Sequence, residues 1–296
     1  MKKIAILLAA YNGREWLEEQ LTSILKQLDV EVEIFISIDF SQDETLSLCE
    51  CFATKERRIH ILPYGERFGG AAANFFRLIK DVDFSRFDYV AFSDQDDIWV
   101  ENKLIRASSF LKDNEIYSSN VTAFWPNGRR FLINKSQPQV KYDFLFEAAG
   151  PGCTYVIRRD VAILFKRFLI DNWEQAKNVN LHDWLFYAYA RVNNYSWVID
   201  SFSGLHYRQH ENNQVGANNT FGAALKRFNL IRSKWYKGEI LKILNLFEEQ
   251  LRLPFKKELV SDGYFNKIKL LWYINEFRRK PRDRLYLALA IIVGAF

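Results

Sequence analysis

The segment Ser93-Asp94-Gln95-Asp96-Asp97-Ile98-Trp99 directly follows the apolar run Tyr89-Val90-Ala91-Phe92. The apolar run has the length and composition of a short buried strand. Three carboxylates within four positions repel one another, so folding tolerates them only where a cation or a hydrogen-bond network compensates. Ligands of open α/β sheets bind beyond the carboxyl ends of the strands. The segment therefore predicts a metal and diphosphate site, although an isolated acidic turn usually just faces water.

Strand-like and helix-like segments alternate from the N-terminus up to this motif. The expected strands are residues 3–9, 32–38, 59–62 and 89–92, and the expected helices are residues 14–27, 44–55 and 71–82. Because these strands are continuous apolar runs, the alternation predicts an α/β fold with a mostly parallel central sheet and helices on both faces.

The pattern changes after the motif. We expect helices at about 100–111, 160–170 and 182–193, and strands at 121–125, 154–157 and 197–199, the last leading to 205–207. Beyond Gly222 the pattern is helical throughout. The sequence therefore predicts a catalytic domain over residues 1–221 and a C-terminal helical appendage over residues 222–296.

Composition bounds the class of protein. Of the 296 residues, 49% are hydrophobic and 16% aromatic, which excludes a disordered chain. Cys49, Cys51 and Cys153 have no metal-ligand spacing, and their odd, sparse number favours a reducing compartment, so the cytoplasm is expected. The apolar run at residues 4–10 is interpreted as a buried strand and not as a secretory signal. No segment reaches the roughly 18 apolar residues of a spanning helix.

Positive charge is concentrated in the C-terminal region. Residues 222–296 carry 16 Lys and Arg against 7 Asp and Glu, whereas residues 1–221 carry 25 against 29. Because this basic region is also amphipathic and aromatic, it predicts peripheral binding to an anionic membrane surface. A second copy of the chain would satisfy an amphipathic stripe equally well. We expect no nucleic-acid partner, because no nucleic-acid motif accompanies the charge.

Five motifs in a fixed order resemble the family 2 inverting glycosyltransferases, which have the Rossmann-like GT-A fold. They are Ala9-Ala10-Tyr11-Asn12-Gly13, the turn at Asp39, the glycine-containing turn at residues 67–74, the acidic motif and His182-Asp183-Trp184. Within that family, the acidic motif, Gly150-Pro151-Gly152-Cys153-Thr154, His182-Asp183-Trp184 and Tyr207-Arg208-Gln209-His210 look like the bacterial rhamnosyltransferase branch. The resemblance covers about residues 3–215.

The resemblance implies a nucleotide-sugar site along the first strands. It places Tyr11 and Asn12 against the base and ribose, and Asp39 on the base ring. The residues implied at this site are Ala10, Tyr11, Asn12, Asp39, Arg67, Asn74, Asp94, Gln95 and Arg208. The chain departs from the usual Asp-Asp-Gly-Ser pattern, because Ile38 replaces one acid and Phe40 replaces the permissive glycine. Asp39 is otherwise an ordinary residue at a helix entry.

The resemblance also implies a divalent cation, Mn²⁺ or Mg²⁺. Asp96 is the expected ligand, with Asp94 facing the ribose and a metal-bound water. A histidine is expected to complete the site, and the family pattern favours His210 over His206. Imidazole suits Mn²⁺ adequately.

The catalytic base implied by the resemblance is Asp183, which would take a proton from the acceptor hydroxyl as that hydroxyl attacks the anomeric carbon. One base and in-line displacement imply inversion. The expected acceptor side comprises Gly152, Cys153, Thr154, His182 and Trp184. A glycosidase would need two carboxylates flanking the bond, and Asp94 with Asp183 would imitate that pair in sequence.

We therefore expect a metal-dependent enzyme that transfers L-rhamnose from dTDP-L-rhamnose to a surface glycan or a lipid-linked saccharide. A UDP-hexose donor is the alternative within the same fold. A sugar nucleotidyltransferase is disfavoured, because residues 9–13 lack a Gly-rich basic loop for a triphosphate. A noncatalytic membrane-surface protein is the alternative from another class.

Overall fold

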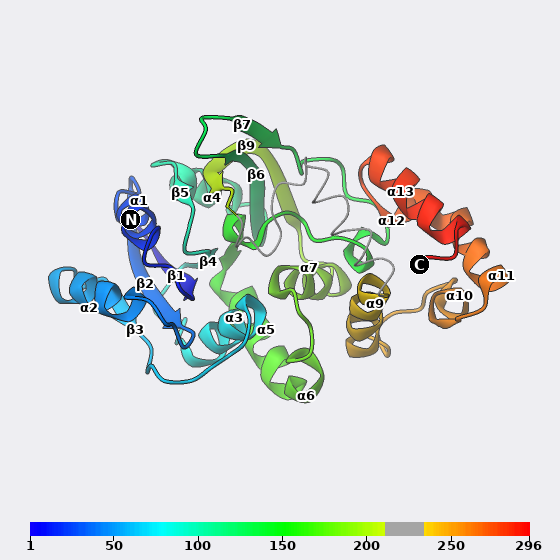
Figure 1. Ribbon diagram of the computed structural model, residues 1–296, viewed down its shortest axis with the longest axis horizontal. Coiled ribbons are helices and arrows are strands. Elements are labelled where there is room, and N and C mark those ends of the chain that lie inside the picture. The colour runs from blue at the N-terminus through cyan, green and yellow to red at the C-terminus, as the bar shows by residue number, and fades with distance from the viewer. Residues whose placement is uncertain (211–233) are drawn as a thin grey trace.

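The computed structural model describes residues 1–210 and 234–296, and Figure 1 shows their arrangement. The expected domain boundary after residue 221 and the last residues of the family resemblance, 211–215, lie outside the described residues. A single 9-stranded sheet runs in the order β3-β2-β1-β4-β8-β6-β9-β5, with β7 paired to β6.

The N-terminal half of the sheet is parallel, as the sequence predicts. It comprises β1 (Lys2–Ala10), β2 (Val30–Ile38), β3 (Ile59–Ile61) and β4 (Tyr89–Ser93). The connecting helices are α1 (Leu17–Leu25), α2 (Thr45–Lys55) and α3 (Ala71–Asp81). Both faces of β1 are buried, with Ile6 in one apolar cluster and Leu7 in the other. Burial on both faces explains why the strand has a continuous apolar sequence.

The second half of the sheet is antiparallel at most of its pairs. It comprises β8 (Val156–Arg158), β6 (Ile116–Phe124), β9 (Trp197–Arg208), β5 (Ile98–Trp99) and β7 (Arg130–Ile133). Only β6 and β9 run parallel among the pairs of this half that the described residues form. β5 follows the acidic motif directly, so the motif is fixed by strands at both ends.

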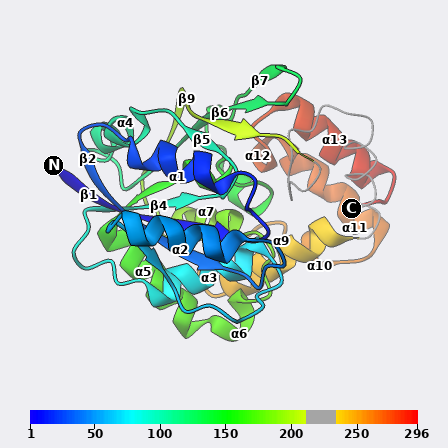
Figure 2. The same cartoon turned by 60° about the vertical axis from the view of Figure 1, so that its left-hand side comes forward.

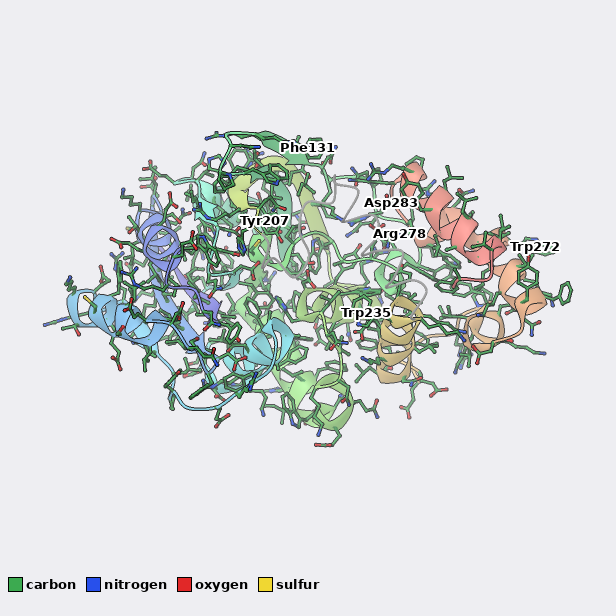
Figure 3. All side chains as sticks on the ribbon, in the orientation of Figure 1. Phe131, Tyr207, Trp235, Trp272, Arg278 and Asp283 are labelled. Carbon is green, nitrogen blue, oxygen red and sulfur yellow. The ribbon has the colours of Figure 1, made fainter. Side chains whose placement is uncertain are left out.

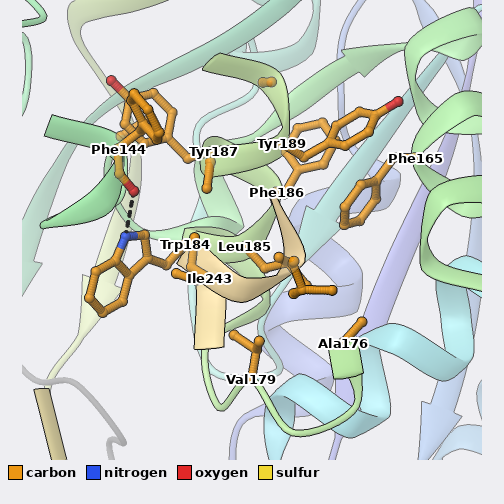
Figure 4. Packing of buried hydrophobic residues seen from close by; sticks show 14 of the residues in the cluster. Phe144, Phe165, Ala176, Val179, Trp184, Leu185, Phe186, Tyr187, Tyr189 and Ile243 are labelled. Atoms are coloured by element: carbon orange, nitrogen blue, oxygen red, sulfur yellow. Dashed lines mark hydrogen bonds between the residues drawn. The ribbon is translucent and has the colours of Figure 1, made fainter. Parts of the chain in front are cut away.

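Helices cover both faces of the sheet. The helices of this half are α4 (Lys103–Phe110), α5 (Arg159–Asp171), α6 (Trp173–Ala176) and α7 (His182–Val192), with short 3-10 turns η1 (Asp143–Leu145) and η2 (Gly152–Thr154). In Figure 2, α1 and α4 lie above the sheet, and α3 and α5 lie below it. The apolar cluster on the α3 and α5 side of the sheet, which contains Leu7, is rich in aromatic rings from α5 and α7, and Figure 4 shows these rings packed together.

The C-terminal region is helical, as expected. It consists of α9 (Trp235–Leu246), α10 (Lys256–Val260), α11 (Tyr264–Ile268), η3 (Lys269–Tyr273), α12 (Ile274–Phe277) and α13 (Pro281–Ile292). These helices share a core with the sheet domain: Tyr236 stacks on Trp184 with ring centroids 5.7 Å apart, and Phe247 stacks on Phe168 at 5.1 Å. Within the described residues, no helix combines the length and apolarity needed to cross a bilayer.

Candidate active site

The carboxyl ends of β1, β2 and β4 meet at one edge of the sheet, and buried hydrogen bonds hold them together. The Ala10 carbonyl accepts the Asp39 N–H at 2.8 Å. Asn74 of α3 lies beneath, only 3% exposed, and its Nδ2 donates to the carbonyls of Ala10 at 3.2 Å and Ser37 at 3.0 Å. Asn74 was expected to contact the nucleotide, but in this structure its side chain links β1 and β2 through these two hydrogen bonds.

Gln95 ties the acidic motif to the loop after β1. Its Oε1 accepts the Tyr11 N–H at 2.8 Å, and its Nε2 donates to the Tyr11 carbonyl at 2.9 Å. Gly13 is needed here, because a Cβ at this position would lie 2.2 Å from Gln95 Oε1. A side chain at position 13 would displace the Gln95 amide and break its two hydrogen bonds to Tyr11.

The loops after β1 and β2 are bound to each other. Asn12 adopts a left-handed conformation with φ of 45°, which asparagine tolerates better than most residues. Its N–H donates to Ser41 Oγ at 3.0 Å, and its Oδ1 accepts the Gln42 N–H at 2.8 Å. The Asn12 amide oxygen, expected near the nucleotide, thus accepts a hydrogen bond from the loop after β2.

Asp39 organises the glycine-containing turn before α3. Its Oδ1 accepts the N–H groups of Phe40 and Phe68, each at 2.8 Å, and its Oδ2 accepts the Gly69 N–H at 2.9 Å. Gly69 has a φ of +79°, a conformation that favours glycine. Arg67 in the same turn is exposed. The Asp39 carboxylate is more than a helix-entry residue, since it fixes the shape of this turn.

Three aromatic side chains remain exposed beside this edge. Tyr11 is 48% exposed, Phe40 49% and Tyr64 36%. Phe40 stacks on Tyr64 with ring centroids 6.1 Å apart and an angle of 12° between the rings. The Tyr64 hydroxyl accepts the Ser41 N–H at 3.2 Å, which holds this pair in place. The departure at Phe40 therefore adds apolar surface to the edge of the sheet.

The acidic motif gathers carboxylates around a buried thiol. Ligand atoms of Asp94, Asp97 and Cys153 all lie within 4.8 Å of one another. Desolvation, followed by the charges of Asp96 and Asp183, raises the pKa of Asp94 to about 7. Burial, followed by the charges of Asp96 and Asp94, raises the pKa of Asp97 well above its usual range. This unfavourable concentration of charge is what a divalent cation would relieve, so the residues present fit a cation site.

Asp96 points to one of the two candidate histidines. His210 Nε2 lies 2.7 Å from Asp96 Oδ2, and the His210 ring stacks on Trp16 at 4.0 Å. His206 lies elsewhere, edge-on to Phe124 at 6.3 Å, and desolvation, followed by the charge of Arg130, lowers its pKa. The structure favours His210, as the family pattern does.

Arg208 braces the acidic motif from β9. Its Nε donates to the Asp96 carbonyl at 2.9 Å, its Nη2 pairs with Glu19, and its N–H donates to Asp97 Oδ1 at 3.3 Å. The guanidinium also lies over the Phe124 ring at 4.7 Å. The arginine expected to clamp phosphate is thus engaged with protein groups in this structure.

Lys103 is a buried cation beneath the motif that sequence reasoning missed. Its Nζ donates to the Cys153 carbonyl at 2.7 Å and lies 3.0 Å from the centroid of the Trp99 ring. Burial lowers the pKa of Lys103 to about 7, although Cys153, Asp97 and Asp94 act to raise it. Trp99, 3% exposed, is a core residue that covers this cation. A lone lysine at the start of a helix carries no sequence signal for such a role.

Asp183 lies at the first turn of α7, where its carboxylate meets two backbone donors. The Trp184 N–H donates to Oδ1 at 2.7 Å, and the Gly152 N–H contributes as well. Burial nevertheless raises the pKa of Asp183 to about 6. Because Asp183 also contributes to the raised pKa of Asp94, the two carboxylates face a common region. The structure thus brings the expected base to the acidic motif, about 90 residues earlier in the chain.

The neighbours of Asp183 are buried more deeply than expected. A Cβ on Gly152 would lie 2.8 Å from His182 Nε2 and 3.0 Å from Asp183 Cβ, so only glycine fits there. His182 stacks on Phe75 at 3.8 Å, and burial lowers its pKa to about 3. Its Nε2 has no hydrogen-bond partner within residues 1–210 and 234–296. His182 is therefore a neutral ring held beneath the acceptor side.

Trp184 and Thr154 also belong to the core. Trp184 is 3% exposed and donates from Nε1 to the Phe144 carbonyl at 2.8 Å, the dashed contact in Figure 4. Thr154 is fully buried and donates from Oγ1 to the Pro151 carbonyl at 2.8 Å. These two side chains, expected on the acceptor side, are therefore buried and bound to backbone carbonyls.

Lys135 is a second residue without a sequence signal. It lowers the pKa of Asp183, and an added Cβ on Gly150 would lie 3.5 Å from its Cγ. Burial lowers the pKa of Lys135 itself to about 8. The C-terminal region fixes the same loop: Arg279 Nη2 donates to the carbonyls of Ala148 at 2.6 Å and Ala149 at 3.1 Å. Long-range contacts of this kind are invisible in one sequence.

Known proteins are similar to this chain in sequence. The profile described as Glycosyl transferase family 2 matches residues 5–172. The chain is 48% identical over 292 residues to a protein of Shigella flexneri named dTDP-rhamnosyl transferase RfbG, covering 98% of this chain and 100% of the relative. It is 24% identical over 208 residues to the Escherichia coli UDP-Glc:alpha-D-GlcNAc-diphosphoundecaprenol beta-1,3-glucosyltransferase WfaP, covering 64% of this chain and 79% of the relative.

Solved structures show the same fold. The crystal structure of S. aureus TarS 1-349 superposes with a TM-score of 0.57 at 17% identity, covering 99% of this chain and 80% of that one. Mannosyltransferase PcManGT from Pyrobaculum calidifontis, solved with GDP-Man and Mn²⁺, superposes with a TM-score of 0.52 at 15% identity, covering 99% and 85%. The chain therefore belongs to glycosyl transferase family 2 and is a glycosyltransferase with the GT-A fold.

Proposed function

We propose that this glycosyltransferase moves L-rhamnose from dTDP-L-rhamnose, with inversion, to a hydroxyl of a bacterial surface glycan carried on a lipid. The name and full-length 48% identity of the Shigella relative support the donor. The observation that carries the chemistry is that η2 lies between Asp183 and the acidic motif: an added Cβ on Gly152 would lie 3.0 Å from Asp183 Cβ, and the sulfur of the next residue, Cys153, lies within 4.8 Å of carboxylate oxygens of Asp94 and Asp97. A base and a diphosphate site must face one anomeric carbon for direct displacement.

The donor site in this proposal is the edge formed by β1, β2 and β4. Asn12, Asp39 and Gln95 shape its loops through backbone hydrogen bonds, so the site is built before the donor arrives. The exposed rings of Tyr11 and of the stacked pair Phe40 and Tyr64 offer a flat apolar wall for the base. Thymine differs from uracil by a methyl group, and an apolar wall favours the base that carries it.

The diphosphate site is assigned to Asp94 and Asp96, with His210 beside Asp96 at 2.7 Å and Arg67 exposed in the turn before α3. Carboxylate oxygens suit Mn²⁺ or Mg²⁺ better than a buried thiol does, and burial raises the pKa of Cys153 well above its usual range. When bound, the cation would supply positive charge that stabilises the departing nucleoside diphosphate.

Asp183 acts as the general base in this proposal. Its pKa of about 6 leaves the carboxylate ionised at neutral pH while keeping it basic enough to take a proton. The Trp184 and Gly152 N–H groups orient it, and Lys135 favours its ionised form. The acceptor oxygen loses its proton to Asp183 as it bonds to the anomeric carbon, and the bond to the diphosphate breaks on the opposite side. A single displacement of this kind inverts the anomeric configuration.

Titration calorimetry with intact donors tests the donor assignment. The Asp183→Asn variant is used so that the donor is not consumed, with Mn²⁺ present throughout. We expect dTDP-L-rhamnose to bind at least about tenfold more tightly than UDP-glucose, because both the base and the sugar differ. Tighter binding of UDP-glucose would overturn the rhamnose proposal and favour the UDP-hexose alternative, which the name of the WfaP relative makes the principal rival.

The acceptor and the place of action are also part of the proposal. A lipid-linked saccharide would bring the enzyme to the cytoplasmic face of a membrane, where nucleotide sugars are available. Membership of the glycosyltransferase family argues against the noncatalytic alternative.

A further inference from the structure

An apolar surface covers the outer side of the C-terminal helices. Phe265 is 84% exposed and Trp272 is 87% exposed, more than any other large hydrophobic residue of the described chain. We call this surface the tail face. Its members are Tyr264, Phe265, Trp272, Leu285, Tyr286, Leu289, Ile292 and Val293.

The tail face is continuous across α11, η3 and α13. The Tyr264 hydroxyl donates to the Ile292 carbonyl at 2.9 Å, which joins α11 to the end of α13. On α13, Leu285, Leu289 and Ile292 recur at helical spacing on one exposed side. The opposite side of the same helix is buried in the core, so the exposed side is not needed to hold α13 in place.

This surface is unlike the rest of the C-terminal region. Soluble proteins expose single large apolar residues often, but contiguous apolar patches usually mark an interaction site. The buried rings of the same region, such as Phe255 and Phe277, pack against each other at 4.8 Å. Some aromatic rings of this region are therefore packed in the core, whereas Phe265 and Trp272 are exposed to water.

Unpaired positive charges occur on the same C-terminal helices and on the loop between α9 and α10. Residues 235–296 carry 12 Lys and Arg against 7 Asp and Glu. Arg252, Lys257 and Lys269 are exposed, and none has an ion-pair partner within the described ranges. In contrast, Lys256 pairs with Glu248 at 2.6 Å. The surface therefore combines apolar and aromatic side chains with free cations, the combination that suits the interface of an anionic bilayer.

We propose that the tail face docks on an anionic lipid bilayer, with Phe265 and Trp272 entering the headgroup region. Charge complementarity selects this occupant: a second copy of the chain would oppose one net positive region to another, whereas anionic lipid neutralises it. Docking is peripheral, since no described helix is able to span a bilayer. The docking itself is argued from the surface alone, and only its role, access to a lipid-linked acceptor, rests on the proposed function.

The geometry links this docking to the acceptor side. The segment between η3 and α13 contains Arg279, which is 3% exposed and holds the carbonyls of Ala148 and Ala149 just before the Gly150–Gly152 loop. Its N–H also donates to Glu147 Oε1 at 2.6 Å. A membrane at the tail face would therefore lie against a body rigidly joined to the acceptor loop. Figure 3 shows Trp272 at the end of the molecule that is formed by these helices.

Vesicle co-sedimentation of the full chain tests the proposal. The probes are vesicles of phosphatidylcholine alone and vesicles with about one third phosphatidylglycerol. The double variant Phe265→Ser/Trp272→Ser removes two side chains that support no core contact, so it should fold. Phe131→Ser, on β7 and 46% exposed, is the matched control. Figure 3 shows Phe131 at a distance from Trp272.

We expect the wild type and Phe131→Ser to bind anionic vesicles, and the double variant to bind them about tenfold or more weakly. Lys257→Glu/Lys269→Glu should also weaken binding, and added salt should weaken the wild type. Equal binding of the wild type and the double variant, or no binding of the wild type, would overturn the proposal. So would a dimer in light scattering that the double variant abolishes, because a second copy would then be the occupant.

Donor binding separates this test from the test of function. The double variant should keep the wild-type affinity for dTDP with Mn²⁺, since the tail face is not part of the donor edge. Vesicle binding without any donor binding would leave the docking proposal standing and contradict the proposed function. Donor binding without vesicle binding would contradict the docking proposal and leave the proposed function standing.

Discussion

The donor half and the acceptor half of the site are built in different ways. At the donor edge, Asp39 accepts three backbone N–H groups, and Gln95 makes two hydrogen bonds to Tyr11. On the acceptor side, Asp183 has a pKa raised to about 6, and His182 Nε2 lacks a partner among the described residues. The loops after β1 and β2 are satisfied by these hydrogen bonds, whereas the acidic motif and the acceptor side hold polar groups in unfavourable surroundings.

This difference indicates where binding and chemistry are located. Satisfied loops form a rigid receptor, which lowers the cost of ordering when a nucleotide binds. Perturbed titratable groups cluster where proton transfer takes place. Changes on the acceptor side should therefore affect turnover, and changes on the donor edge should affect affinity and selectivity.

Replacing Asp183 by Asn should have the largest effect. The amide keeps the shape and cannot accept the acceptor proton, so transfer should fall by about 10²–10⁴-fold, the range of a general base. Stability should be kept, because burial disfavours the ionised carboxylate. The measurement is the initial rate of rhamnosyl transfer. Near wild-type transfer by this variant would remove Asp183 from the mechanism and erase the contrast between the halves.

Gly152→Ala should have the next largest effect. The added methyl would lie 2.8 Å from His182 Nε2 and 3.0 Å from Asp183 Cβ, and it would push the base out of line. We expect about a hundredfold lower kcat, because small displacements of a catalytic group cost this much. Gly150→Ala is the matched control, since its added Cβ would approach no atom more closely than Lys135 Cγ at 3.5 Å, an ordinary van der Waals contact. Equal rates for the two variants would show that the close approach at Gly152 has no role in catalysis.

The pH dependence of kcat/KM should reflect the ionisation of Asp183, with a smaller effect than the two substitutions above. Asp183 must be ionised to act as a base, so kcat/KM should fall as the pH drops through about 6. Lys135 lowers the pKa of Asp183, so Lys135→Met should move the acidic limb of the profile to higher pH. An acidic limb that stays in place in this variant would mean that Lys135 does not act on the base.

The smallest effect should come from the donor edge. Phe40→Gly restores the glycine of the common family pattern and removes half-exposed apolar surface. The ratio of dTDP to UDP affinity should fall by up to about tenfold, the scale of one methyl group in an apolar pocket. Calorimetry with both nucleotides and Mn²⁺ measures it. An unchanged ratio would place the base away from Phe40.

Much of the fold was predictable because burial leaves a periodic trace. Continuous apolar runs predicted β1, β2 and β4, which are buried on both faces. The first half of β6 was missed, because Ser118, Ser119 and Asn120 are polar although buried. Their partners come from far along the chain: Trp197 Nε1 donates to Ser118 Oγ at 2.9 Å, and the Lys135 N–H donates to Asn120 Oδ1 at 2.6 Å. A single sequence shows the polar residue but not its partner.

The site was predictable to the level of motifs and not of individual contacts. The acidic motif, Asp183 and His210 converge as the family pattern implies. Asn74 and Arg208 were expected to contact the ligand, and both bind protein groups instead. Lys103 and Lys135 were not anticipated, because their effects on Asp94 and Asp183 arise from tertiary packing. A motif fixes a residue type, while the fold decides what its atoms touch.

Thermal stabilisation of the wild type and of Asp96→Ala by dTDP and by UDP, each with and without Mn²⁺, is the most direct test of the central claim. Ligand binding to the native state raises the melting temperature. The account predicts a manganese-dependent rise with dTDP that exceeds the rise with UDP and is lost in Asp96→Ala. A chain that shows no manganese-dependent rise with either nucleotide would contradict a donor site at the acidic motif.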